Sequence, residues 1–127
     1  MLIGIERLLE DLRALSFTVD GPITSDAKQW AILRKFAIAS GRFAGQTVDI
    51  AIQAPPDYPS TAPRGFYVSP QIAPMNQLKI HDRKQECAGL GGDWQYWSRP
   101  IPDGTWEPSR GGKRLLSHWN NVFDHYK

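Results

Sequence analysis

The segment from Phe43 to Pro70 constrains the fold of this chain more than any other stretch. It reads as an apolar strand, a proline-rich loop and a second apolar strand. Four prolines, Pro55, Pro56, Pro59 and Pro63, fall within nine residues around a single tyrosine. Proline fixes the backbone angle φ, removes a hydrogen-bond donor and pushes the preceding residue into an extended conformation. The loop is therefore predicted to be stiff and unable to pair fully within a sheet.

Hydrophobic periodicity predicts the elements that precede this segment. Residues 5–15 carry leucine and isoleucine at helical spacing opposite a charged face, which indicates an amphipathic helix. Asp20, Gly21 and Pro22 are predicted to end that unit and to open a turn. Residues 29–40 alternate with period two, which predicts a strand. One face of that strand is expected to carry Trp30, Ile32, Arg34, Phe36 and Ile38.

The predicted fold class is α+β, with an N-terminal helix, an antiparallel β-meander, a long irregular segment and a C-terminal helix. Strands are expected at 29–40, 47–54 and 64–69, joined by short connections, which favours antiparallel pairing. Residues 71–104 show no clear periodicity, and a loop of that length inside a compact domain is often functional. The apolar stripe of the last helix consists of Leu115, Leu116, Trp119, Val122 and Phe123.

Composition limits the class of protein. A length of 127 residues predicts one domain over 1–127, and 41% apolar residues favour a globular chain. A net charge of +2 is too small to indicate nucleic-acid binding. Neither a membrane span nor a signal peptide is expected, because no apolar run approaches twenty residues and the N-terminus soon becomes charged. One cysteine requires no oxidising compartment, so the cytoplasm is the expected location.

The strand–loop–strand segment resembles the ubiquitin-conjugating enzyme superfamily, including its inactive variants. In that family an apolar strand ends at a proline, and a loop with a Tyr-Pro pair and a later proline precedes the next strand. The matching positions here are Ile52, Pro55, Tyr58, Pro59 and Pro63. Residues 106–108 look like the family's Trp-x-Pro, which precedes a long helix. The chain is most similar to divergent prokaryotic conjugating-enzyme-like proteins.

This resemblance implies a carrier of a ubiquitin-like protein. Cys87, the sole cysteine, lies between the third predicted strand and the Trp-x-Pro element, as the family's order demands. It would accept the modifier from an activating enzyme as a thioester and pass it to an amine, such as a lysine side chain. No bound cofactor is expected, because the activating enzyme uses the ATP. The family further implies a setting in bacterial operons, some of them linked to antiviral defence.

The sequence departs from the active family in two ways. The His-Pro-Asn tripeptide, whose asparagine is thought to stabilise the oxyanion, is absent, and Asn76 and His81 are the nearby candidates for an equivalent donor. The interval from Cys87 to Trp106 is about twice the usual one. These departures keep two alternatives open. The first is a non-catalytic module that binds a ubiquitin-like protein or a partner enzyme; the second is a small hydrolase that uses Cys87 with His81.

Two further groups receive structural interpretations. His118 and His125 lie seven residues apart on the last helix, and without a third ligand they are expected to be surface residues, not a metal site. The aromatic segment 94–99 is expected mainly to plug the core, although its tryptophans and Arg99 also fit a cation–π contact or a protein interface.

Overall fold

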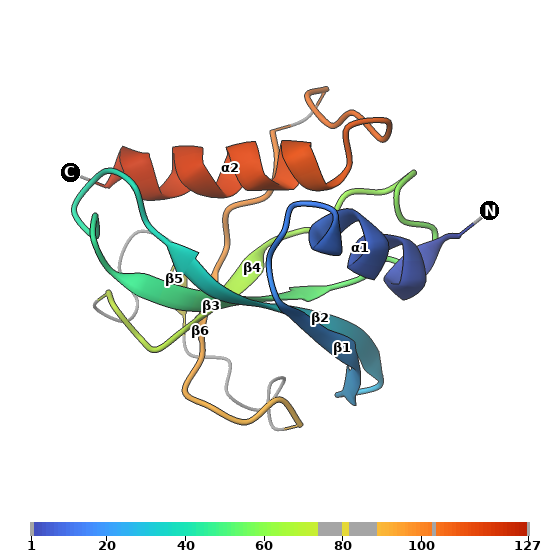
Figure 1. The fold of residues 1–127 in the computed structure, drawn as a ribbon, viewed down its shortest axis with the longest axis horizontal. Helices are drawn as coiled ribbons and strands as arrows, with labels where there is room; N and C mark the ends of the chain where they lie inside the picture. Colours follow the sequence, from blue (N-terminus) through green and yellow to red (C-terminus); the bar gives the residue numbers. More distant parts are fainter. Residues whose placement is uncertain (1, 74–79, 82–88, 103, 127) are drawn as a thin grey trace.

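The computed structural model describes residues 2–73, 80–81, 89–102 and 104–126 (Figure 1). Within these ranges the chain forms two helices and six strands. The helices are α1 (Gly4–Arg13) and α2 (Gly112–His125). The strands are β1 (Val19–Ser25), β2 (Lys28–Ala37), β3 (Thr47–Gln53), β4 (Phe66–Ser69), β5 (Ile80–His81) and β6 (Gln95–Trp97). The predicted α+β class, with a helix at each end of an antiparallel sheet, is confirmed.

The strands form one antiparallel sheet in the order β1-β2-β3-β4-β6-β5. The first four strands follow one another as a meander, which extends the predicted three-strand meander by β1. The prediction of a wholly irregular segment over residues 71–104 was wrong, because β5 and β6 fall inside it. β6 pairs with both β4 and β5, so the chain returns to fill the position beside β4. Strands of two and three residues are too short to show a period in the sequence.

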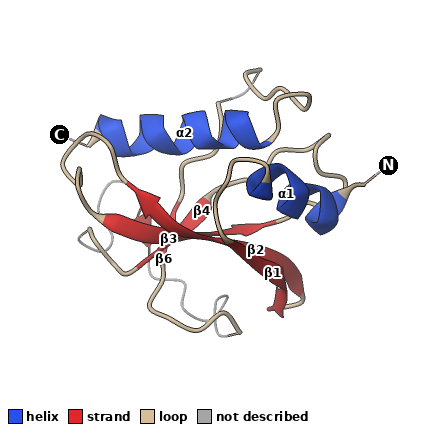
Figure 2. Ribbon diagram, in the orientation of Figure 1, coloured by secondary structure: helices blue, strands red, loops and turns tan. Residues whose placement is uncertain are grey.

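Both helices lie on one face of the sheet (Figures 1 and 2). The apolar faces predicted for the two helices pack there against the sheet, and Leu8, Ile50 and Trp119 are at most 1% exposed. They belong to the larger hydrophobic core, which also contains Phe36, Phe66, Trp97 and Phe123. Neither helix in the described ranges is long and apolar enough to cross a membrane.

The opposite face of the sheet carries a second, smaller core. Trp30, Ile32, Ala51, Tyr67 and Trp94 are buried together there, and partly buried Leu90 and Tyr96 pack against them. The chain just before β6 covers this face on the side away from the helices (Figure 1). The central strands are therefore buried on both faces, which explains why β2 and β3 read as nearly continuous apolar runs.

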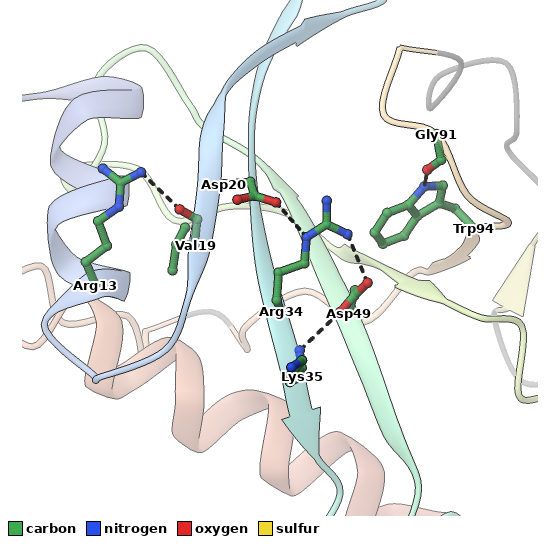
Figure 3. Close-up of polar contacts among 8 residues, drawn as sticks. All are labelled: Arg13, Val19, Asp20, Arg34, Lys35, Asp49, Gly91 and Trp94. Carbon is green, nitrogen blue, oxygen red and sulfur yellow. Dashed lines mark hydrogen bonds and ion pairs between the residues drawn. The ribbon is translucent and has the colours of Figure 1, made fainter.

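A bulge in β2 corrects the predicted face of that strand. Leu33 pairs with Ile50 and Phe36 with Val48, so β2 spends one residue more than β3 over this interval. Lys35 takes up the extra residue with φ of 59°, and its N–H donates to Asp49 Oδ1 (Figure 3). Trp30 and Ile32 consequently face the smaller core, whereas Phe36 and Ile38 lie in the larger one.

The predicted turn at Asp20, Gly21 and Pro22 is instead part of β1. The register of β1 against β2 shifts between Asp20 and Ile23, where β1 carries one extra residue. Gly21 has φ of 143°, and a Cβ there would lie 2.9 Å from the Trp30 carbonyl oxygen. Gly and Pro are tolerated because β1 is an edge strand and the bulge removes the need for a ladder donor.

An ion-pair cluster holds the bulged parts of β1 and β2 together. Arg34 Nε lies 2.8 Å from Asp20 Oδ2, and Arg34 Nη1 lies 2.9 Å from Asp49 Oδ2 (Figure 3). The guanidinium thus joins β1, β2 and β3 on the face opposite the helices. Its pKa is raised, chiefly by the hydrogen bond to Asp20.

Candidate functional site

The predicted site residues fall in or beside the segment between β5 and β6. Asn76 and Cys87 lie outside the described residues. His81 is the second residue of β5, and its backbone pairs with that of Tyr96 in β6. The roles predicted for the three residues therefore remain predictions, and the structure contributes the surroundings that hold the two ends of this segment.

The upstream end is held by the edge of the sheet. Ile80 is opposite Trp97, and His81 is opposite Tyr96, so both β5 residues are aligned on β6. Trp97 is fully buried, which fixes the position of β6 against the larger core. The last described residues before Cys87 thus lie at a defined edge of the sheet.

The downstream end is held at β1, the opposite edge of the sheet. The N–H of Gly89 donates to Ser25 Oγ at 3.1 Å, and Ser25 is buried. A Cβ at Gly89 would lie 3.0 Å from the Thr24 carbonyl oxygen, so the segment at Gly89 lies closer to β1 than a larger residue would easily allow. The Trp94 indole N–H donates to the Gly91 carbonyl (Figure 3). The chain two residues after Cys87 is therefore anchored.

The proline-rich loop forms a bracket between α1 and the start of α2. Tyr58 is fully buried, and its hydroxyl donates to Asp11 Oδ2 at 2.7 Å. The Trp106 indole N–H donates to the Pro59 carbonyl at 2.7 Å, and the Gly4 N–H donates to the Tyr58 carbonyl at 2.9 Å. Tyr58 thus has a structural role, with the Asp11 carboxylate of α1 and the Trp106 ring as its partners.

Comparison with models of protein families shows to which family this chain belongs. A family model described as prokaryotic E2 family E matches residues 9–124. The chain belongs to prokaryotic E2 family E. The match runs from α1 almost to the end of α2, so it includes the proline-rich bracket, the sheet and the segment that contains Cys87. Comparisons with curated proteins and with solved structures found no match.

Membership of the prokaryotic E2 family indicates a conjugating-enzyme-like role among protein partners. It confirms the resemblance drawn from the Tyr-Pro loop and from the Trp-x-Pro element at Trp106. That element lies directly before α2, as the resemblance implied. The two motifs also contact each other, since the Tyr58 and Trp106 rings are 6.0 Å apart.

The bracket makes a testable contribution to stability in this family member. Tyr58→Phe is expected to lower the free energy of unfolding by about 1.5 kcal/mol at pH 7, because a buried hydroxyl donates to a carboxylate. Burial also raises the pKa of Tyr58. In the unfolded chain Tyr58 ionises near pH 10, whereas the folded state keeps its proton. The contribution of Tyr58 is thus full below that pH and falls as the pH rises above it.

Urea unfolding of the wild type and of Tyr58→Phe at pH 7 and pH 10.5 measures this contribution. The stability difference between the two proteins should shrink at the higher pH. The other three tyrosines are present in both proteins, so their contributions cancel in the comparison. A difference that is equal at both pH values would contradict the assigned hydrogen bond.

The histidines of α2 divide into one buried and one exposed residue. His118 is 8% exposed, so its predicted surface position was wrong, whereas His125 is exposed as predicted. His118 Nε2 lies 2.6 Å from the Arg99 carbonyl oxygen, so Nε2 carries the proton that is donated. Burial lowers the pKa of His118, which keeps the ring neutral. Within the described ranges no cluster of metal-ligating side chains occurs.

The aromatic segment before α2 is mainly structural, as expected. Trp94 is 2% exposed and Trp97 is fully buried, in the smaller and the larger core respectively. Arg99 places its guanidinium carbon 5.4 Å from the Tyr126 ring centre, and its Nη2 donates to the Tyr126 hydroxyl at 2.9 Å. The structure places Arg99 in a cation–π contact with Tyr126, which directly follows α2, whereas the sequence suggested a tryptophan of the segment 94–99.

Sequence reasoning missed the residues that anchor the segment around Cys87. Ser25 and Gly89 are 64 positions apart, and neither lies in a motif. The apolar residues Leu90 and Trp94 were the only available signal, because their burial requires the segment to pack on a face of the sheet.

Proposed function

We propose that this prokaryotic E2 family member carries a ubiquitin-like protein as a thioester on Cys87 and transfers it to an amine. The family match carries the proposal, because it spans the single cysteine and both motifs of the resembled superfamily. The anchors at β5 and at Gly89 support it, since they hold the described residues on either side of Cys87 in defined positions. An activating enzyme and a ubiquitin-like protein are the proposed partners, and the cytoplasm is the proposed location.

The proposed reaction has two acyl transfers. The Cys87 thiol gives up its proton and attacks the modifier's C-terminal carbonyl, a new C–S bond forms, the C–S bond to the activating enzyme breaks, and the leaving thiolate takes up the released proton. An amine then attacks the Cys87 thioester, an amide forms, and the Cys87 thiol is regenerated. Each step passes through an oxyanion that needs a hydrogen-bond donor. Asn76 and His81 are proposed to supply that donor or to position the thiol, in place of the missing His-Pro-Asn.

The test is adduct formation with the cognate activating enzyme, a ubiquitin-like protein and ATP. The wild type is expected to form an adduct that a reductant releases. Cys87→Ser should form an oxyester that resists reductant, and Cys87→Ala should form none, because the chain has one cysteine. Asn76→Ala and His81→Ala should slow discharge to free lysine by about tenfold or more if either residue stabilises the oxyanion. An adduct that survives Cys87→Ala would refute the assignment.

A binding module is the second candidate function, and the absence of His-Pro-Asn favours it. Such a module would hold a ubiquitin-like protein or the activating enzyme without forming a covalent bond. Association of the modifier with both the wild type and Cys87→Ala, with no adduct in either, would support this candidate over the first.

A further inference from the structure

A groove of about 980 Å³ lies where four strands of the sheet begin or end. Lys28 starts β2, Gln53 ends β3, Gly65 precedes β4, and Ser98 follows β6, and all four line it. Tyr67 of the smaller core lines the groove, and so does Ile5 of α1, so the groove runs along the end of the sheet and is not confined to one face. None of its described lining residues belongs to the proposed thioester site.

The wall of the groove depends on Gly65, because the Tyr96 side chain occupies the space that a Cβ at residue 65 would need. A Cβ at Gly65 would lie 2.7 Å from the Tyr96 hydroxyl oxygen and 2.8 Å from the Trp97 carbonyl oxygen. The Tyr96 ring packs 4.8 Å from the Tyr67 ring, which packs edge-on against Trp30 at 4.9 Å. One wall of the groove is therefore a row of packed aromatic rings, and such a wall is formed before a ligand arrives.

The charge of the groove has one sign. Lys28 and Arg64 are exposed cations on its rim. Among the described lining residues there is no aspartate or glutamate, and no ion pair involves either cation within the described part of the chain. The side chains of Gln29, Gln53 and Ser98 add neutral donors and acceptors. This arrangement complements a ligand that carries carboxylates and peptide groups.

The groove also has apolar residues in its lining. Ile3, which is 58% exposed, lines it together with Ile5, Pro55 and Pro56. An exposed isoleucine next to a proline-lined wall gains free energy when a partner's apolar side chain covers it. The apolar residues and the cations together favour an occupant that carries both apolar and acidic side chains.

We propose that this groove binds an extended peptide segment of a partner protein, in which apolar side chains alternate with carboxylates. An extended chain suits a groove that crosses strand ends, because neighbouring side chains point to opposite sides and can contact the apolar residues and the cations in turn. The inference goes beyond the proposed function, since it needs neither Cys87 nor a thioester. Its failure would leave the adduct experiment unaffected.

The test is fluorescence anisotropy with labelled hexapeptide probes added to the full chain. One probe alternates leucine and glutamate, a second alternates leucine and glutamine, and a third alternates leucine and lysine. The glutamate probe is expected to bind about tenfold more tightly than the glutamine probe, and the lysine probe more weakly than both. Raising the salt concentration should narrow these differences.

Charge reversal in the groove gives the matched comparison. Arg64→Glu and Lys28→Glu should each weaken binding of the glutamate probe about tenfold, and Arg64→Gln should weaken it less. Lys113→Glu is the control, because Lys113 is exposed on α2, whose described residues do not line the groove. Circular dichroism of every variant confirms that it is folded.

Three results would overturn the proposal. The first is equal affinity for the glutamate and lysine probes. The second is a loss of affinity in Lys113→Glu as large as that in Arg64→Glu. The third is tighter binding of a single-stranded oligonucleotide of equal charge with the same sensitivity to Arg64→Glu, which would assign the groove to phosphates.

Discussion

Gly41→Ala is expected to lower the free energy of unfolding by at least about 3 kcal/mol, because steric overlap adds to backbone strain. A Cβ on Gly41 would lie 2.2 Å from the Phe123 carbonyl oxygen and 2.7 Å from the Tyr126 carbonyl oxygen. Both atoms are backbone, so no side-chain rotation can relieve the overlap. The N–H of Arg42 donates to the Tyr126 carbonyl at 2.5 Å, which ties the β2–β3 connection to the end of α2.

Gly45→Ala is the matched control for this prediction. Gly45 has φ of 89°, close to the 85° of Gly41, but a Cβ there would meet no atom within 4 Å. This variant should therefore lose only about 1–2 kcal/mol through backbone strain. Urea unfolding of the three proteins measures both losses. Equal losses in the two variants would show that the connection does not approach α2 as closely as described.

Trp97→Ala is expected to cost about 3–5 kcal/mol, the usual range for removing a large buried aromatic side chain. Trp97 is fully buried in the larger core. Its ring centre lies 5.1 Å from that of Phe123, 5.3 Å from Tyr126 and 5.9 Å from Phe43. The side chain thus joins β6, α2 and the β2–β3 connection, and its removal leaves a cavity that these elements border.

Trp97→Phe separates packing from polarity at the same position. The Trp97 indole N–H is buried without a hydrogen-bond partner in the described part of the chain. Phenylalanine removes that uncompensated donor, and this gain offsets part of the cost of the smaller ring. We expect Trp97→Phe to lose less than half of what Trp97→Ala loses, as measured by thermal and urea unfolding. A loss in Trp97→Phe as large as that in Trp97→Ala would mean that the indole nitrogen has a partner.

The elements that the sequence predicts well are those with a strong local signal. The stripe of leucines in α1, the alternation in β3 and the stripe of α2 each follow a single period from end to end, so the periodicity alone locates them. The proline-rich loop is equally local, since each proline restricts its own backbone and that of its neighbour.

The features that the sequence does not predict depend on distant partners. The bulge at Lys35 moves Phe36 and Ile38 to the other face, and a non-glycine residue with positive φ leaves no mark in a hydrophobicity pattern. β6 is inserted beside β4 by pairing of residues about 30 positions apart. His118 is buried with its ring proton donated to the carbonyl of Arg99, which is 19 positions away.

The candidate site also combines features that the sequence predicts with features that it does not. The family, the cysteine and the order of the motifs follow from short stretches of sequence, and the family match confirms the family. The anchors of the segment could not be predicted, because the Ser25–Gly89 contact joins two residues 64 positions apart, neither of which lies in a motif. The groove beside β4 also escaped prediction, since it exists through the absence of a side chain at Gly65 and not through a motif.

Because the sheet is buried on both faces, four of the chain's five tryptophans report on one core or the other through their fluorescence. Trp30 and Trp94 sit in the smaller core, and Trp97 and Trp119 in the larger one. The smaller core is closed by a short stretch of chain that packs on a sheet already stabilised from the other side, so it can open locally while the larger core stays intact. Emission from the first pair should then change at lower denaturant concentration than emission from the second, and a single unfolding curve recorded at one wavelength would merge the two events.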